Sequence, residues 1–366
     1  MKKTLTLLAL TISFSLNAQL TSVTEGGNTG QRLSISNASY HGDIGSNAVD
    51  LSYQPFLSST RGATGGRSTA MGYNTTASGA NSTSMGSGTT ASGNNSTAMG
   101  VGTEAGGTTS IAMGDSSTAS GYVSTAMGYN TTASGDYSTA MGYLTTSSGN
   151  NSTAMGYGTT ASGGYGAIAM GDSSTASGHS STAMGYLTTS SGNNSTAMGY
   201  YTTASDYGSL VIGQYNSSGS SATSAASFST SAPAFVIGNG TNSSNKSDAF
   251  KVMFNGDTTV GGDITISSDA RLKSNIVSLG STLSKLLLID GKSYEKDGKQ
   301  RIGVLAQEIQ EVFPELVTED GNEMLAVNYQ GLVPVLINAL KEQDKIIKSQ
   351  EERLTNIEKL IAKLND

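Results

Sequence analysis

The chain has 366 residues, enough for two or three domains by length alone, and its formal net charge is −7. It holds 47 Gly and neither Trp nor Cys, which excludes a disulfide framework, a thiolate site and one large globular core of the usual kind. The acidic balance argues against nucleic acid as a partner, because phosphate binding needs a basic surface. The two His residues, His41 and His179, lie in unrelated contexts, so we predict neither a metal site nor a cofactor.

Residues 1–18 read MKKTLTLLALTISFSLNA. Lys2 and Lys3 give a positive start, the stretch from Leu5 to Leu16 is mostly apolar, and Ala18 is a small residue. This pattern is typical of a secretory signal peptide and is short for a membrane span, although an ordinary N-terminal core segment is the alternative. No later segment could cross a bilayer as a helix. We therefore predict an exported protein, secreted or at the cell surface, without a transmembrane anchor.

A repeat dominates residues 66–214. Met recurs every fourteen residues from Met71 to Met198, with one step of fifteen at GGYGAIAM. A typical unit reads YSTAMGYLTTSSGN, in which Thr alternates with Ala and Met before a Gly. This alternation favours a short strand ended by a turn, whereas Gly, Ser and Thr are poor formers of a coiled-coil helix. Two strands and two turns per unit predict one coil of a parallel β-solenoid; a disordered Ser/Gly linker is the alternative, which the strict register disfavours.

The alternation also predicts which side chains face inward. Thr69 and Met71 should face one way and Ala70 the other. The small Ala positions leave a narrow core that buries too little apolar area for one coil to stand alone, so we expect several chains to pack side by side.

STAMG and its relatives IAMGD (111–115) and LVIGQ (210–214) resemble the head repeats of trimeric autotransporter adhesins. The resemblance implies a mainly β protein with a left-handed parallel β-roll that associates as a homotrimer. It also implies an adhesive or spacer function, no catalytic residues in the rod, and a surface glycan or protein as receptor. We expect residues 19–65 to cap the first coil with a strand in NAVDLSYQPF. Residues 215–267, with PAFVIGNG and AFKVMFNGD, should form a β connector.

After residue 268 the composition changes. Of 47 charged residues, 29 fall within 269–366. We predict a small α+β domain at 268–332, with a helix over 302–313 and a strand over 324–329. A heptad pattern runs through 333–366 and predicts a long coiled-coil helix, although a single amphipathic helix lying on its own domain is the alternative. The a positions are Val333, Leu340, Ile347, Leu354 and Ile361, and the d positions are Leu336, Gln343, Gln350, Ile357 and Leu364.

SDARLK, GVLAQEIQEVFPELV and AVNYQGLVPVLINAL, in this order, resemble the C-terminal intramolecular chaperone of phage tailspikes and endosialidases. That family trimerises a β-rich fibre and is also classed as a serine autopeptidase. The resemblance implies that Ser268 and Lys273 form a catalytic dyad and that the bond between Ser268 and Asp269 is cut. Arg271 would support the dyad; alternatively, Asp269 and Arg271 could hold the loop by an ion pair.

The residues themselves are compatible with this chemistry. A Ser hydroxyl needs a base, and in the absence of a nearby His that base is Lys273, whose ordinary pKa of about 10.4 must be lowered by burial or by Arg271. Attack by Ser268 on its own carbonyl would need a four-membered ring, and both cleavage within one chain and cleavage by a neighbouring chain stay open. Without the resemblance, the stretch predicts a helix N-cap at Ser268, with Asp269 near the positive helix end.

Two hypotheses follow. The first is an exported trimeric fibre or adhesin whose chaperone tail assembles it and then cuts itself off as a single-turnover serine peptidase. The second is a purely structural adhesin with a permanent C-terminal trimerisation domain. Neither the rod nor the tail offers residues for an enzyme that acts on external substrates.

Overall fold

The computed structural model describes residues 20–296 and 298–365, which form two compact units divided between Thr265 and Ile266. The predicted signal peptide, residues 1–18, lies outside the described residues. Within the described part of the chain, no helix is long and apolar enough to cross a membrane.

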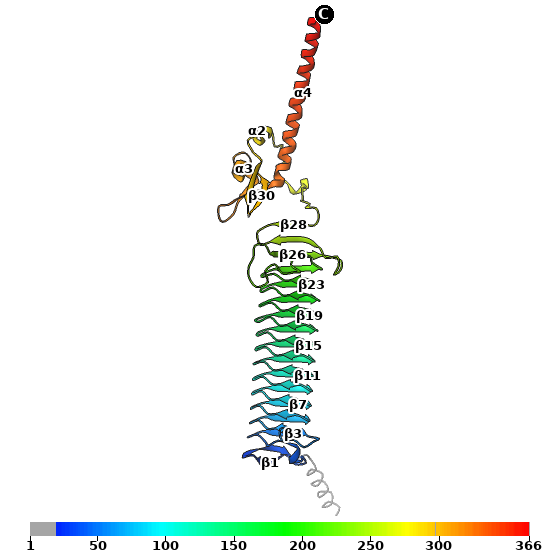
Figure 1. The fold of residues 1–366 in the computed structure, drawn as a ribbon, viewed down its shortest axis with the longest axis vertical. Helices are drawn as coiled ribbons and strands as arrows, with labels where there is room; N and C mark the ends of the chain where they lie inside the picture. Colours follow the sequence, from blue (N-terminus) through cyan, green and yellow to red (C-terminus); the bar gives the residue numbers. More distant parts are fainter. Residues whose placement is uncertain (1–19, 297, 366) are drawn as a thin grey trace, which may run out of the picture. The chain divides into compact units, whose positions relative to one another are not determined.

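The first unit is a β-solenoid of stacked coils (Figure 1). Each repeat supplies a five-residue strand to a 17-stranded sheet and a two-residue strand to an 11-stranded sheet. The five-residue strands are β3 (Val49–Tyr53), β5 (Thr69–Tyr73), β7 (Thr83–Ser87), β9 (Thr97–Val101), β11 (Ile111–Asp115), β13 (Thr125–Tyr129), β15 (Thr139–Tyr143), β17 (Thr153–Tyr157), β19 (Ile168–Asp172), β21 (Thr182–Tyr186), β23 (Thr196–Tyr200) and β25 (Leu210–Gln214). The two-residue strands are β4 (Gly62–Ala63), β6 (Thr76–Ala77), β8 (Thr90–Ala91), β10 (Glu104–Ala105), β12 (Thr118–Ala119), β14 (Thr132–Ala133), β16 (Thr146–Ser147), β18 (Thr160–Ala161), β20 (Thr175–Ala176), β22 (Thr189–Ser190) and β24 (Thr203–Ala204).

Every repeat pairs in parallel with the next, residue for equivalent residue. Met127 lies opposite Met141, and Tyr129 opposite Tyr143. The one step of fifteen keeps this register, because Met155 still lies opposite Met170 while the extra residue sits in a turn beside the Asn150–Tyr165 bridge. The prediction of a parallel solenoid with 14-residue coils is therefore confirmed.

The core of the solenoid is a column of Ala side chains. Ala70, Ala126 and Ala140 are fully buried, as are the Ala residues at equivalent positions, whereas Met71 on the opposite face is 37% exposed. The predicted facing of Thr69, Ala70 and Met71 is thus confirmed. These Ala side chains bury little apolar area, so the coils also depend on backbone hydrogen bonds to their neighbours.

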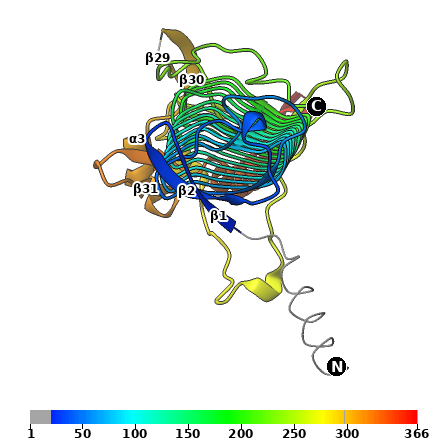
Figure 2. The same ribbon diagram turned by 90° about the horizontal axis from the view of Figure 1, so that it is seen from below.

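At the N-terminal end, β1 (Leu20–Glu25) and β2 (Asn28–Leu33) form an antiparallel hairpin, and β2 pairs in parallel with β3. A 3₁₀ turn, η1 (Ala38–Tyr40), follows. The stack begins inside the segment predicted as a cap, since β3 continues the columns with Leu51 opposite Met71. Figure 2 looks along the stack from this end and shows the coils superimposed beyond β1 and β2.

A buried ionic cluster joins β1, β2, the η1 loop and β3 at this end, and no sequence motif predicts it. Arg32 Nη1 donates to Glu25 Oε1 at 2.7 Å, and His41 Nδ1 lies 2.7 Å from Asp50 Oδ2. Burial opposes ionisation of Asp50, but hydrogen bonds from His41 and Ser52 outweigh it and lower the pKa of this carboxyl. The ionised Asp50 therefore accepts, and His41 Nδ1 carries the proton.

At the other end, β26 (Pro233–Asn239) continues the parallel stack on β25, and β27 (Asp248–Met253) and β28 (Thr258–Val260) add antiparallel strands. The last repeat carries Asp206 where earlier repeats carry Gly. The Asp206 carboxylate accepts the backbone N–H of Ser224 at 2.7 Å, so this residue fixes the loop that closes the stack.

The second unit is small and α+β, as predicted. Its elements are η2 (Ala270–Leu272), α2 (Leu283–Leu286), β29 (Lys292–Lys296), β30 (Lys299–Gly303), α3 (Ala306–Val312), η3 (Pro314–Leu316), β31 (Val317–Glu319), β32 (Leu325–Val327), η4 (Tyr329–Gly331) and α4 (Leu332–Asn365). Ile309, Phe313 and Val335 form its core. The helix predicted over 302–313 begins later, because Ile302 pairs with Ser293 in the β29–β30 hairpin.

The first prediction concerns the Gly columns. Gly142 has φ +123°, and an added Cβ would collide with the carbonyl oxygen of Gly156 in the next coil. Gly102 has φ +59° in an open turn, where the equivalent Asn130 adopts φ 50°. We expect Gly142→Ala to lower the free energy of unfolding by about 2–4 kcal/mol, and Gly102→Asn to change it by less than about 0.5 kcal/mol. Thermal denaturation of the full chain measures both, and equal effects would contradict the close coil-to-coil contact.

The second prediction follows from the lowered pKa of Asp50. A carboxyl whose folded pKa lies below its unfolded value of about 3.9 stabilises the protein above that value, and the contribution disappears as pH falls through the folded pKa. We expect amide hydrogen exchange in β1–β3 to accelerate below about pH 4 relative to the central coils. In Asp50→Asn this pH dependence should vanish, and its persistence would assign the acid sensitivity to another group.

Candidate functional site

The structure brings Ser268 and Lys273 together at the start of the second unit. Lys273 Nζ donates to Ser268 Oγ at 2.7 Å. The single 3₁₀ turn of η2 lies between them and folds the two ends of SDARLK toward each other. A serine hydroxyl in direct contact with an amine is the arrangement that a Ser-Lys nucleophile requires.

Asp269, and not Ser268, caps the helical turn. Its carboxylate accepts the backbone N–H of Arg271 at 2.8 Å. The helix-cap interpretation of Ser268 is therefore wrong, and its hydroxyl is left to the contact with Lys273. This could not be read from the sequence, since Ser and Asp are equally good N-cap residues.

Arg271 pairs with Asp269 rather than with the dyad. Its Nη2 donates to Asp269 Oδ2 at 2.7 Å. This hydrogen bond lowers the pKa of the Asp269 carboxyl and raises the pKa of the Arg271 guanidinium. Arg271 therefore orders the turn that carries both ends of the dyad, and its charge is largely matched by Asp269.

Both members of the Ser268–Lys273 pair are exposed in the single chain. An ammonium in water is a poor base, because its ordinary pKa of about 10.4 keeps it protonated at neutral pH. Covering the pair with protein would remove water from the amine and favour its neutral form. The geometry of a nucleophile and its base is thus present in one chain, and the desolvated environment that would activate it is not.

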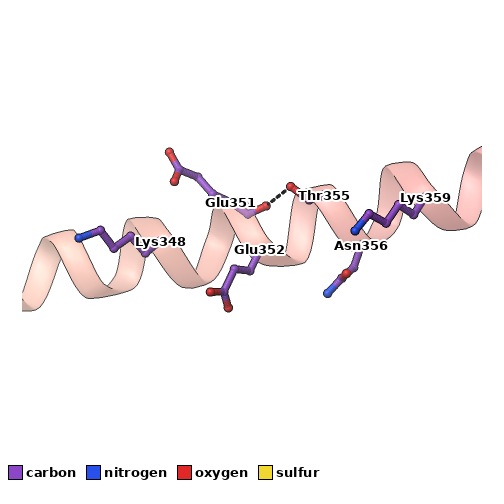
Figure 3. Close-up of a pocket in the computed structure, with 6 residues that line it drawn as sticks. All are labelled: Lys348, Glu351, Glu352, Thr355, Asn356 and Lys359. Atoms are coloured by element: carbon purple, nitrogen blue, oxygen red, sulfur yellow. Dashed lines mark hydrogen bonds between the residues drawn. The ribbon is translucent and has the colours of Figure 1, made fainter.

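Helix α4 carries an exposed apolar stripe. Its a and d positions are open to solvent; Leu340 is 65% exposed and Leu354 58%. The opposite face is polar: Figure 3 shows Lys348, Glu351, Glu352, Thr355, Asn356 and Lys359 on this one helix, with Thr355 Oγ1 donating to the Glu351 carbonyl. The helix is therefore amphipathic along its length, with a face suited to a partner helix.

Glu342 ties α4 to the segment before α2. Its carboxylate accepts from Ser281 Oγ at 2.7 Å and from the backbone N–H of Thr282 at 2.6 Å. These hydrogen bonds, the one from Ser281 foremost, lower the pKa of Glu342. The base of α4 is thereby fixed on the core of Ile309 and Val335, so the helix is an integral part of the unit.

In the described residues, no group of His and carboxylate side chains is arranged to hold a metal ion.

Comparison with known families agrees with both halves of the structure. Residues 268–318 match the family described as chaperone of endosialidase. Eight overlapping or adjoining segments between residues 63 and 216 match the YadA head domain repeat. The solenoid therefore carries YadA-type head repeats, and the segment from Ser268 carries the endosialidase chaperone signature.

Curated relatives include long tail fibre proteins of bacteriophages. The chain is 36% identical over 103 residues to long tail fiber protein Gp37 of Enterobacteria phage K3, an alignment that covers 25% of this chain and 8% of that protein. It is 30% identical over 114 residues to the Gp37 of Enterobacteria phage M1, covering 28% of this chain and 45% of that protein. The chain thus spans less than half the length of these relatives.

The exposed stripe of α4 generates the third prediction. An Asp at Leu354 would place a charge in the a position of any helix–helix interface, whereas Glu352 lies on the polar face. We expect Leu354→Asp to reduce the molar mass measured by light scattering from that of an oligomer to that of one chain. Glu352→Lys is the matched control and should keep the oligomer. An unchanged mass for Leu354→Asp would show that α4 does not mediate self-association.

Proposed function

We propose that the chain is an exported trimeric fibre or adhesin-like surface protein whose C-terminal segment assembles it and then cuts itself off between Ser268 and Asp269. The observation that carries the proposal is the 2.7 Å contact from Lys273 Nζ to Ser268 Oγ, inside the segment that matches the endosialidase chaperone. The head repeats and the relationship to tail fibre proteins support the fibre.

Exposed apolar columns support assembly into a trimer. The Met and Tyr side chains of the solenoid and the a and d positions of α4 are half open to water in one chain. Burying them against further copies supplies the apolar area that the Ala core lacks. Both matching families form trimers, so we take three as the number of chains.

Cleavage uses one serine and one lysine. Neutral Lys273 takes the proton of Ser268 Oγ, which attacks the Ser268 carbonyl carbon of a neighbouring chain, because attack within its own residue would close a four-membered ring. An Oγ–C bond forms, the bond from this carbon to the nitrogen of Asp269 breaks, and the leaving amine takes the proton from Lys273 Nζ. Water then hydrolyses the ester, and this hydrolysis restores Ser268 and leaves a carboxylate at the cut end.

Assembly and cleavage are coupled by desolvation. In a single chain the amine of Lys273 is exposed, and a covered trimer interface favours its neutral form. The tail would therefore be released only after it has aligned the three chains. Loss of the tail leaves an assembled fibre without the element that aligned the chains. Disassembly and reassembly of the fibre then become slow.

The rival function is a structural adhesin with a permanent trimerisation domain. The exposed amphipathic face of α4 favours it equally, since a clamp needs no nucleophile. The two functions differ only in the fate of the peptide bond between Ser268 and Asp269.

The fourth prediction separates them by mass spectrometry of the purified full chain. We expect the wild type to yield a fragment comprising residues 269–366, and Ser268→Ala and Lys273→Ala to reduce its formation by at least about a hundredfold, because each removes a member of the dyad. Ser267→Ala removes the adjacent hydroxyl and should cleave like the wild type. A wild-type chain that forms trimers and stays full length would establish the permanent clamp.

A further inference from the structure

A short apolar segment follows the turn that carries the dyad, and its side chains are open to water. Ile276 is 67% exposed, Val277 83% and Leu279 52%. Residues 274–280 belong to no helix or strand, and they form no hydrogen bond with another described residue. Three large apolar side chains in one such stretch favour a surface that removes them from water.

The C-terminal end of this segment is fixed to the N-terminal part of α4. Thr282 is 2% exposed, and its Oγ1 donates to the Val335 carbonyl at 3.0 Å. The Glu342 carboxylate holds Ser281 and Thr282 from the same helix. Seven residues span at most about 25 Å, so residues 274–280 stay near this part of α4.

An apolar cavity of about 250 Å³ lies beside the same part of α4. No polar side chain is among its described lining residues. Besides Gly291 these residues are Leu286, Ile289, Val304, Ile309, Leu332 and Leu336. The cavity is smaller than the about 300–1,000 Å³ of small-ligand sites, and a polar ligand would lose its hydration there without gaining a hydrogen bond from a side chain. Its size and lining suit aliphatic side chains.

In a single chain the segment and the cavity are exposed at the same time, so the segment does not cover the cavity of its own chain. A second copy can supply the missing occupant. Leu336 lines the cavity and is also a d position of the exposed stripe of α4. A second α4 packed along this stripe would lie about 8–10 Å away, axis to axis. Its own residues 274–280, anchored at the equivalent Thr282, are then within reach of the cavity.

We propose that residues 274–280 of one chain dock into this cavity of a neighbouring copy, with Ile276, Val277 and Leu279 as the side chains that fill or cover it. The proposal rests on the self-association in the proposed function and names the contact that brings the dyad of one chain to another. Lys273 directly precedes the segment, so docking carries Ser268 and Lys273 onto the surface of the neighbour. Protein on that side removes water from the amine.

The fifth prediction is tested by disulfide cross-linking in the full chain, which has no Cys of its own. One uncleaved chain, Ser268→Ala, carries Ile276→Cys, Val277→Cys or Leu279→Cys, and a coexpressed Ser268→Ala chain of different mass carries Gly291→Cys. An added Cβ at Gly291 meets no atom within 4 Å. We expect at least one of the three pairs to give a disulfide between the unlike chains, because docking brings the Cβ atoms to the about 3.5–4.5 Å that this bond needs.

Gly321→Cys is the matched control, since an added Cβ is equally open there and Gly321 lies outside the cavity lining. We expect it to give at least about tenfold less of the mixed disulfide than Gly291→Cys. Equal cross-linking at the two positions, or an oligomer without any mixed disulfide, would overturn the proposal. So would a chain carrying both Cys residues that forms the disulfide only within itself.

Cleavage provides a second measurement. Ile276→Ser, Val277→Ser and Leu279→Ser combined in the cleavable chain should keep the oligomer held by α4 and reduce formation of the 269–366 fragment at least about fivefold, because the dyad loses its place on the neighbour. Unchanged cleavage would contradict the docking. If the wild type stays full length, cross-linking decides alone: a mixed disulfide then supports docking while the cleavage in the proposed function fails. A chain that cleaves without a mixed disulfide gives the reverse result.

Discussion

The narrow interior of the solenoid is the constraint on which the rest of the molecule depends. The central coils bury an Ala such as Ala140 and a few Ser or Thr side chains, and Gly142 approaches the next coil so closely that no Cβ fits. A coil of this kind gains little from apolar burial and much from parallel hydrogen bonds above and below it. It therefore cannot form alone, and its first and last members present edges that need closing.

Both ends of the stack meet this need with charged side chains placed where the repeat is broken. At the start, Arg32 of the β1–β2 hairpin pairs with Asp50 of β3. Glu25 pairs with Arg32, and His41 pairs with Asp50. At the finish, Asp206 replaces a Gly and binds the backbone of a closing loop. Buried charges stabilise only when their partners are correctly placed, so these clusters favour one register of the end strands over shifted ones.

The repeat could be predicted from sequence because one residue type, Met, marks every coil, and because alternation alone assigns Ala70 inward and Met71 outward. The residues that depart from the repeat could not be placed from the sequence. Residues 32, 41 and 50 are far apart in sequence and become neighbours only when β2, η1 and β3 fold together. Ile302 looked helical because apolar spacing does not distinguish the last strand of a hairpin from the first turn of a helix. At the dyad, the contact between Ser268 and Lys273 agrees with the family pattern, but the choice of Asp269 as the cap depends on local backbone geometry.

The exposure of the dyad is itself informative about the order of events. A nucleophile activated within one chain would cut before assembly, and the solenoid would lose the device that aligns its chains. Here Arg271 is held by Asp269 and Lys273 is solvated, so neither lowers the barrier to deprotonating Ser268 in a lone chain. The nucleophile also cannot reach its own carbonyl without a four-membered ring. Under the proposed function, self-association would meet two independent requirements at once, because it removes water from the amine and supplies a second chain, so cleavage would follow assembly.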